Sequence, residues 1–289
     1  MSAASKVVEG IFRLSGASKE LPAKKFYKKL RRNAIRDKKG GKPLLFFNGR
    51  VESEIYCGMR YFVFVPREVE TGKSVLYIHG SSYMNRYRVA QLSFAAGIAR
   101  NTHAKVYFPL YPKLPITTVL PCVALLNNFY VFLRKKGEVF LLGDSSGASL
   151  SLALAAERAD ITSVIAISPW LKLSLGEECR DIDTDVMLCP STLQRVARLW
   201  AYDLPFENVK LSPYFGDYSG KELFLFAGEK ELFRPDILSF CREKEKEGAK
   251  ISYREGREQP HCYPLLPTPE GREARKEIYR KLQNELYGE

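Results

Sequence analysis

The chain has 289 residues, enough for one large α/β domain or two small ones, and its apolar content of 45% is typical of a globular protein. No apolar stretch reaches transmembrane length without a charge or a proline, and the six cysteines form no C-x-x-C pair, which excludes a membrane-spanning protein and a disulfide framework. The formal net charge of +12 is high and indicates either an anionic partner or one strongly solvated surface.

Residues 4–38 are expected to form one or two helices of an N-terminal cap, about residues 1–45, because their apolar residues recur at helical spacing. No signal peptide is apparent at the start, so we expect a cytoplasmic protein. Most of the excess positive charge lies in the basic segment from Lys24 to Lys42. This segment has neither zinc-ligand spacing nor a nucleic-acid-binding motif. We therefore expect a solvated face of a lid helix that binds no specific nucleic acid.

The rest of the chain alternates between strand-like and helix-like segments. Residues 51–66 carry β-formers on both sides of Cys57-Gly58, which predicts an antiparallel hairpin. Further strands are expected at residues 73–80, 105–108, 139–143, 163–168, 221–228 and 250–254. Helices are expected at residues 89–100, 119–133, 148–156, 191–202, 235–247 and 269–286. This alternation predicts one α/β domain with a mostly parallel central sheet, helices on both faces and a helical cap insertion at about residues 171–210.

The segment from Val139 to Ser149 carries the strongest chemical signal in the chain. An apolar strand ends at Gly143, and Gly143-Asp-Ser-Ser-Gly147 leads within three residues into a helix-forming run. A turn this tight needs small residues on both sides, and it projects the residue at its tip clear of the sheet. The pattern is the G-x-S-x-G nucleophile elbow, with Ser145 as the nucleophile.

A serine hydroxyl acts as a nucleophile at neutral pH only with a neighbouring base and an acid that orients the base. Two of the three histidines, His79 and His103, precede the serine in the sequence. The third, His261, lies between the last expected strand and the terminal helix. Because the α/β-hydrolase triad follows the order serine, acid, histidine, we expect His261 to be the general base.

The segment His79-Gly-Ser-Ser-Tyr83 follows an expected strand, where this fold supplies amide donors for the negative oxygen of a tetrahedral intermediate. With this segment the chain resembles the hormone-sensitive-lipase-like branch of the α/β-hydrolase superfamily, whose loop reads His-Gly-Gly-Gly. The elbow is similar to that branch's Gly-Asp-Ser-Ala-Gly. Three further segments also resemble the branch: Tyr111–Pro115, Ile167–Leu171 and Leu211–Phe215.

This resemblance implies an α/β-hydrolase fold and assigns roles to the residues of the loop. The amides of Ser81, Ser82 and Ser146 would form the oxyanion hole, although serines stand where the family has glycines or alanine. His79 and Gly80 would support the oxyanion loop. No metal or organic cofactor is implied.

The acid of the triad belongs just after the strand at residues 223–227, and here the chain departs from the family. Many relatives place an aspartate where this chain has Lys230. Three nearby carboxylates remain as candidates, of which we rank Glu231 first, Asp236 second and Glu229 third.

Together these residues predict a serine hydrolase that cleaves short-chain carboxylic esters through an acyl-enzyme on Ser145. The resemblance implies an acetyl-esterase-like carboxylesterase for a small-molecule ester, with Tyr83, Trp170 and the N-terminal helices walling the acyl pocket. Two alternatives stay open: an amidase or deformylase with the same triad, and a non-catalytic small-molecule-binding protein on a degenerate hydrolase fold. The sequence also leaves a homodimer open.

Overall fold

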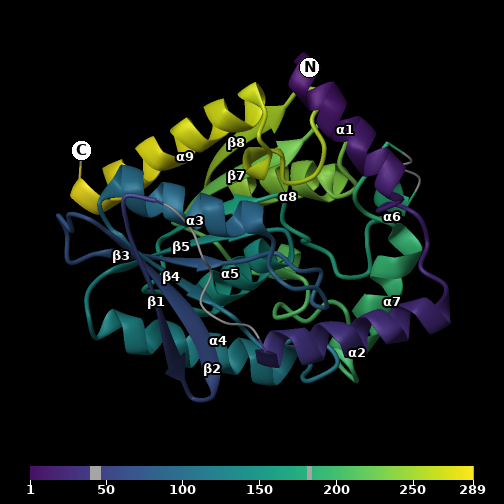
Figure 1. The fold of residues 1–289 in the computed structure, drawn as a ribbon, viewed down its shortest axis with the longest axis horizontal. Coiled ribbons are helices and arrows are strands. Elements are labelled where there is room, and N and C mark those ends of the chain that lie inside the picture. The colour runs from purple at the N-terminus through teal and green to yellow at the C-terminus, as the bar shows by residue number, and fades with distance from the viewer. Residues whose placement is uncertain (40–46, 181–183, 289) are drawn as a thin grey trace.

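The computed structural model describes residues 1–39, 47–180 and 184–288, which contain one eight-stranded sheet in the order β1-β2-β4-β3-β5-β6-β7-β8 (Figure 1). In this order all neighbouring strands from β4 to β8 are parallel. The β1–β2 and β2–β4 pairs are antiparallel. The prediction of a mostly parallel sheet is confirmed. The strands are β1 Gly49–Tyr56, β2 Met59–Pro66, β3 Ser74–Ile78, β4 Lys105–Pro109, β5 Val139–Asp144, β6 Ser163–Ile167, β7 Glu222–Gly228 and β8 Lys250–Gly256.

The predicted hairpin is the β1–β2 pair. Tyr56 pairs with Met59 across a two-residue loop of Cys57 and Gly58. Both loop residues have positive φ, 46° and 79°, as a type I′ hairpin turn requires. The strong twist of such a turn brings β2 back beside β1 and leaves it free to pair with β4 on its other side.

Helices cover both faces of the sheet, as predicted. Figure 1 shows α3 and α9 on one side of the sheet and α4 on the other. Each face has its own cluster of buried side chains, one centred on α3 and α9 and the other on α4, α5 and α8. The α-helices are α1 Ala3–Ser15, α2 Ala23–Lys39, α3 Val89–Thr102, α4 Val119–Arg134, α5 Ser146–Glu157, α6 Glu177–Arg180, α7 Pro190–Ala201, α8 Arg234–Lys246 and α9 Pro269–Tyr287; short 3-10 turns lie at Pro213–Phe215 and Tyr263–Leu265.

The N-terminal helices and the insertion between β6 and β7 lie together. Figure 1 shows α1, α2, α6 and α7 gathered along one side of the molecule. Hydrogen bonds join them: the Leu21 amide donates to Thr192 Oγ1 at 3.3 Å, and Arg195 donates to the Leu21 carbonyl at 2.7 Å. The residues before α2 are therefore tied to α7, 171 and 174 positions away in the sequence.

Helix α2 has one buried and one charged face. Phe26 and Leu30 are fully or almost fully buried, whereas Lys24, Lys25 and Lys28 are exposed. The described part of the basic segment is thus the solvated helix face that the sequence predicts, and Lys42 lies outside the described residues. No described helix is both long and apolar enough to cross a membrane.

Candidate active site

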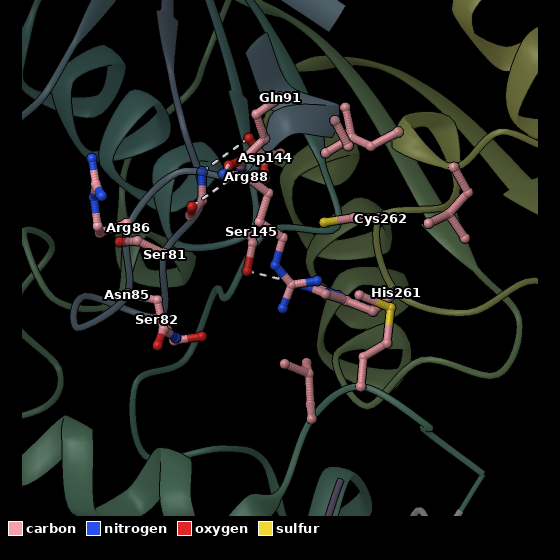
Figure 2. A pocket seen from close by; sticks show the side chains of 16 residues that line it. Ser81, Ser82, Asn85, Arg86, Arg88, Gln91, Asp144, Ser145, His261 and Cys262 are labelled. Atoms are coloured by element: carbon pink, nitrogen blue, oxygen red, sulfur yellow. Dashed lines mark hydrogen bonds between the residues drawn. The ribbon is translucent and has the colours of Figure 1, made fainter. Parts of the chain in front are cut away.

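The candidate residues meet at the carboxyl ends of β3 and β5, which are neighbours in the sheet. The chain leaves β3 toward β4 on one side and returns to β5 on the other, so the loops that follow β3 and β5 diverge. Such a switch point leaves a crevice outside the strand ends, where open α/β sheets bind ligands. A pocket with about 620 Å³ of empty space, including the part open to solvent, lies there. Ser145 and His261 both line it (Figure 2).

Ser145 lies at the tip of the turn between β5 and α5. Its φ and ψ of 53° and −128° fall in a region that L-residues rarely adopt, as expected for a nucleophile elbow. A Cβ atom at Gly147 would clash with the backbone of Ile78 and His79, and one at Gly143 would clash with the backbone of Gly147. The glycines on both sides are therefore required. The Ser145 amide donates to the Ile167 carbonyl at 2.7 Å, which fixes the elbow to β6.

His261 lies in the loop between β8 and α9, with its ring buried beside the elbow. Its Nε2 atom is 3.0 Å from Ser145 Oγ, within hydrogen-bonding distance, and Figure 2 shows the two side chains facing each other. The loop is held from α9 by Arg275, which donates to the Leu266 carbonyl at 2.8 Å. The structure thus brings together the predicted nucleophile and the predicted base, which are 116 positions apart in the sequence.

Glu231 lies behind the histidine and is fully buried. One carboxylate oxygen, Oε2, accepts hydrogen bonds from the Gly228 amide at 2.8 Å and from Ser168 Oγ at 2.6 Å. The other, Oε1, is 3.8 Å from His261 Nδ1, which is longer than a hydrogen bond. Within the described residues, neither Oε1 nor Nδ1 has another partner. A shift of about 1 Å would join them, and catalytic hydrogen bonds are often this long before substrate binds.

The two other candidate acids lie elsewhere. Asp236 is buried in α8, where it binds Lys172 Nζ at 3.3 Å and accepts from the Gly176 amide at 3.1 Å. Glu229 accepts from the amide of Glu258 on the outside of the loop. Neither carboxylate contacts His261 in the described structure, so only the first-ranked acid lies beside the base.

The charge state of His261 follows from its neighbours. Burial disfavours the charged ring, but Cys262 and Glu231 outweigh burial and raise the pKa of His261 well above its ordinary value. Burial also raises the pKa of the Cys262 thiol. The Glu231 carboxylate is the acidic group beside Nδ1, where its charge would stabilise a protonated His261.

The three amides expected to form the oxyanion hole differ in their partners. The Ser81 amide donates to Ser146 Oγ at 2.9 Å, so it is occupied by a hydroxyl that the family's alanine lacks. The amides of Ser82 and Ser146 have no acceptor in the part of the chain that the structure describes. Ser82 has a φ of 47°, in the left-handed region that favours glycine, at a cost of about 1 kcal/mol. The amides of Ser82 and Ser146 are therefore available to an oxyanion, whereas the Ser81 amide is bound to Ser146 Oγ.

The loop that carries these amides is fixed from below by two polar side chains. Asp144 is buried, and its Oδ1 atom accepts from the Gly80 amide at 2.9 Å and from Tyr77 at 2.7 Å. The Tyr111 hydroxyl donates to the His79 carbonyl at 2.7 Å. Burial lowers the pKa of His79 well below its ordinary value, so this ring is a neutral packing group. His79 and Gly80 thus lie where the resemblance places the support of the loop.

Tyr83 and Trp170 do not line the pocket, contrary to expectation. Both are buried in an aromatic stack in which Tyr83 lies between Trp200 and Trp170, at centroid distances of 4.5 and 5.6 Å. Because their ring faces pack against other aromatic rings, these side chains present no free face to a ligand. Among the described residues the N-terminal helices contribute nothing to the pocket wall either. Its apolar side is instead made by Met187, Leu188, Leu265 and Leu266.

Two polar residues that support the site were missed from the sequence. Ser168, directly after β6, donates to Glu231 and accepts from the Cys262 amide at 2.9 Å, so it joins the acid loop to the histidine loop. Asp185, in the insertion, is buried and accepts from the Leu232 amide at 2.8 Å and the Met187 amide at 2.7 Å. The only sequence signal was the place of Ser168 at the carboxyl end of a strand.

Comparisons with known proteins agree with this geometry. A family model described as alpha/beta hydrolase fold matches residues 75–265. The chain is 26% identical over 224 residues to an acetyl-hydrolase of Streptomyces hygroscopicus, covering 71% of this chain and 73% of that protein.

Solved structures agree as well. An esterase/lipase from an uncultured bacterium superposes with a TM-score of 0.85 at 20% identity, covering 100% of both chains. An esterase from the bacterial hormone-sensitive lipase family gives a TM-score of 0.84 at 20% identity, covering 99% of both. At this level of identity the superpositions establish the fold. Because the family model spans well over half of the sequence, the chain belongs to the α/β-hydrolase family, as its resemblance to the hormone-sensitive-lipase-like branch predicted.

Proposed function

We propose that this protein is a serine esterase that hydrolyses short-chain carboxylic esters through an acyl-enzyme on Ser145. The observation that carries the proposal is the 3.0 Å contact between Ser145 Oγ and His261 Nε2 at a strained strand-to-helix turn. The similarity to an acetyl-hydrolase supports a short acyl group. A protein that only binds its ligand needs neither the strained serine nor the base, so the contact argues against a degenerate, non-catalytic hydrolase.

The proposed reaction assigns a residue to each step. His261 Nε2 takes the proton of Ser145 Oγ as the oxygen attacks the ester carbonyl, and Glu231 stabilises the imidazolium that forms. The free amides of Ser82 and Ser146 would bind the negative oxygen of the tetrahedral intermediate. The intermediate collapses to the acyl-enzyme as His261 returns the proton to the leaving alcohol. Water, deprotonated by the same histidine, then releases the acid and restores Ser145.

The N-terminal helices and the insertion at about residues 171–210 would form one cap over this single domain. Three contacts support the assignment. Asn33 on α2 donates to the Met84 carbonyl at 2.9 Å, next to the oxyanion loop. Ser5 on α1 donates to Gln259 beside His261 at 3.2 Å, and Glu9 on α1 pairs with Lys230 in the acid loop at 3.6 Å. The cap would thus contact the oxyanion loop, the histidine loop and the acid loop.

The direct test is covalent labelling with a serine-directed fluorophosphonate. We expect one label per chain, carried by the peptide that contains Ser145, and protection of that serine by a short-chain ester. Measured with 4-nitrophenyl acetate and its amide counterpart 4-nitroacetanilide, turnover of the ester should be the faster of the two. Absence of labelling together with absence of ester turnover would overturn the proposal, and faster turnover of the anilide would replace it with an amidase.

We also expect a preference for short acyl groups. The aromatic stack of Tyr83, Trp170 and Trp200 fills the space next to the elbow, and Met187 and Leu188 close the pocket from the insertion. A long chain would have to displace packed side chains, whereas an acetyl to butyryl group fits beside them. The check is kcat/KM for 4-nitrophenyl esters from acetate to palmitate. Faster turnover of the long esters would instead indicate a lipase.

A further inference from the structure

The lining of the pocket also carries two arginines. Arg86 and Arg88, from the segment between the oxyanion loop and α3, both line the space in front of Ser145. The one carboxylate on the lining that the structure describes is Asp144, whose oxygens are taken by Tyr77, Gly80 and Gln91. In Figure 2 the Arg88 side chain extends from the rim toward Ser145 and His261. Arg88 therefore brings positive charge to a lining on which the described residues leave no open negative charge.

Arg88 stands where the fold itself disfavours a cation. It is the residue before the first turn of α3, at the positive end of the helix dipole, a position in which Ser, Thr, Asp and Asn are preferred. Its guanidinium makes no hydrogen bond or ion pair with any other described residue, and it is exposed. Natural proteins break such local rules at functional sites, and Arg88 lines the pocket that contains Ser145.

A second cation lies near it. Burial first, and then the charges of Arg88 and Arg32, lower the pKa of Lys29 on α2. Helix α2 is held at this place by Asn33, which donates to the Met84 carbonyl. Like charges brought together by packing repel each other, and an anion bound between them relieves that repulsion.

The backbone of Arg88 is rigidly joined to the catalytic elbow. The Arg88 amide donates to Gln91 Oε1 at 2.7 Å, and Gln91 Nε2 donates to Asp144 Oδ2 at 2.7 Å. Asp144 directly precedes Ser145. Two hydrogen bonds therefore fix the origin of the arginine side chain relative to the nucleophile, which is the preorganisation that a specificity-determining group needs.

We propose that the ester substrate carries an anionic group, a carboxylate, and that the Arg88 guanidinium binds it. This inference rests on the proposed esterase function and names the substrate class of that same site. A planar guanidinium matches a carboxylate with two parallel hydrogen bonds, and such charge-assisted bonds are the stronger kind. The apolar residues Met187, Leu188, Leu265 and Leu266 would hold the rest of the substrate.

The test compares pairs of esters that have similar shapes and different charge. With the charge on the acyl side, the pair is 4-nitrophenyl hemiglutarate and 4-nitrophenyl pentanoate. With the charge on the alcohol side, it is 4-acetoxybenzoate and 4-acetoxybenzamide. For one pair or both, we expect wild type to favour the anionic ester in kcat/KM. The Arg88→Met variant should reduce that anionic-to-neutral ratio by about 10- to 100-fold, the value of a charge-assisted hydrogen bond.

Arg100→Met is the matched control. Arg100 is exposed near the other end of α3, about 18 Å along the helix from Arg88, so this variant removes the same charge without touching the pocket. The ratio should stay at the wild-type value. Arg88→Lys should restore part of it, because the charge returns without the planar fork.

Each outcome bears on a different claim. Turnover of the neutral esters with no Arg88-dependent preference in either pair would overturn the anionic substrate and leave the esterase intact. An equal loss of ratio in both arginine variants would also overturn it, because the effect would then be long-range steering by net charge. No turnover of any ester by wild type would overturn the esterase proposal, and the inference with it.

Discussion

Replacing Ser145 with alanine should lower kcat by about 10⁶, the loss measured when the nucleophile of a well-studied serine hydrolase is removed. The fold should remain, because within the described residues the Ser145 side chain hydrogen-bonds to His261 alone, and alanine can keep the amide bond to Ile167. Steady-state kinetics with 4-nitrophenyl acetate measure the loss, and circular dichroism checks the fold. The variant should also lose fluorophosphonate labelling.

Ser146→Ala is the matched control, since it removes the neighbouring hydroxyl and keeps its amide. In this structure that hydroxyl accepts from the Ser81 amide. The substitution recreates the Gly-Asp-Ser-Ala-Gly pattern and frees a third donor for the oxyanion, so kcat should be retained or increased. Equal losses in the two variants would place the nucleophile elsewhere.

Glu231→Gln should lower kcat by about 10⁴, as the loss of charge at the acid did in the serine-protease triad. A glutamine keeps the shape and the bond from Ser168, but it supplies no charge to stabilise the imidazolium. Glu229→Gln and Asp236→Asn are the controls, because neither carboxylate contacts His261. A crippling Asp236→Asn beside a near-normal Glu231→Gln would assign the acid to Asp236.

The pH profile of kcat/KM shows whether Glu231 stabilises the charge on His261 or only packs beside it. The base must be neutral to accept a proton, so kcat/KM of the free enzyme rises as the pH rises through the pKa of His261. Because that pKa is raised, the acid limb of wild type should lie above pH 6.5. Removing the Glu231 charge lowers the pKa, so the residual activity of Glu231→Gln should have its acid limb at lower pH. A limb that does not move would contradict the assignment.

The sequence was most informative where structure is local. The elbow is a local pattern, because crowding at a strand-to-helix turn dictates Gly143 and Gly147, and the burial of parallel strands dictates their apolar runs. The first rank of Glu231 among three candidate acids followed from its place just after β7, and the choice of His261 from its place after β8. Both inferences need the order of elements along the chain and the order of the triad in α/β-hydrolases.

The hydrogen bonds that support the site were not predictable in the same way, because they join distant segments. Ser168 and Glu231 are 63 residues apart, and Asp185 and Leu232 are 47 apart, with no periodicity that links them. The aromatic side chains were misassigned for a related reason. A tyrosine or tryptophan near an active site can contact a ligand or pack in the core, and the sequence does not distinguish the two. Here Trp200, from the insertion, stacks on Tyr83 and makes it part of the core.

That stack also gives the protein an internal optical reporter. The chain has two tryptophans, Trp170 after β6 and Trp200 on α7, and Tyr83 of the oxyanion loop lies between them. Stacked aromatic transitions couple, so near-ultraviolet circular dichroism and intrinsic fluorescence report the contact between α7, the sheet and the loop. Any separation of α7 from the sheet would disrupt this coupling and place indole rings in water. Stopped-flow fluorescence can therefore test, with no added dye, whether α7 moves relative to the sheet during turnover.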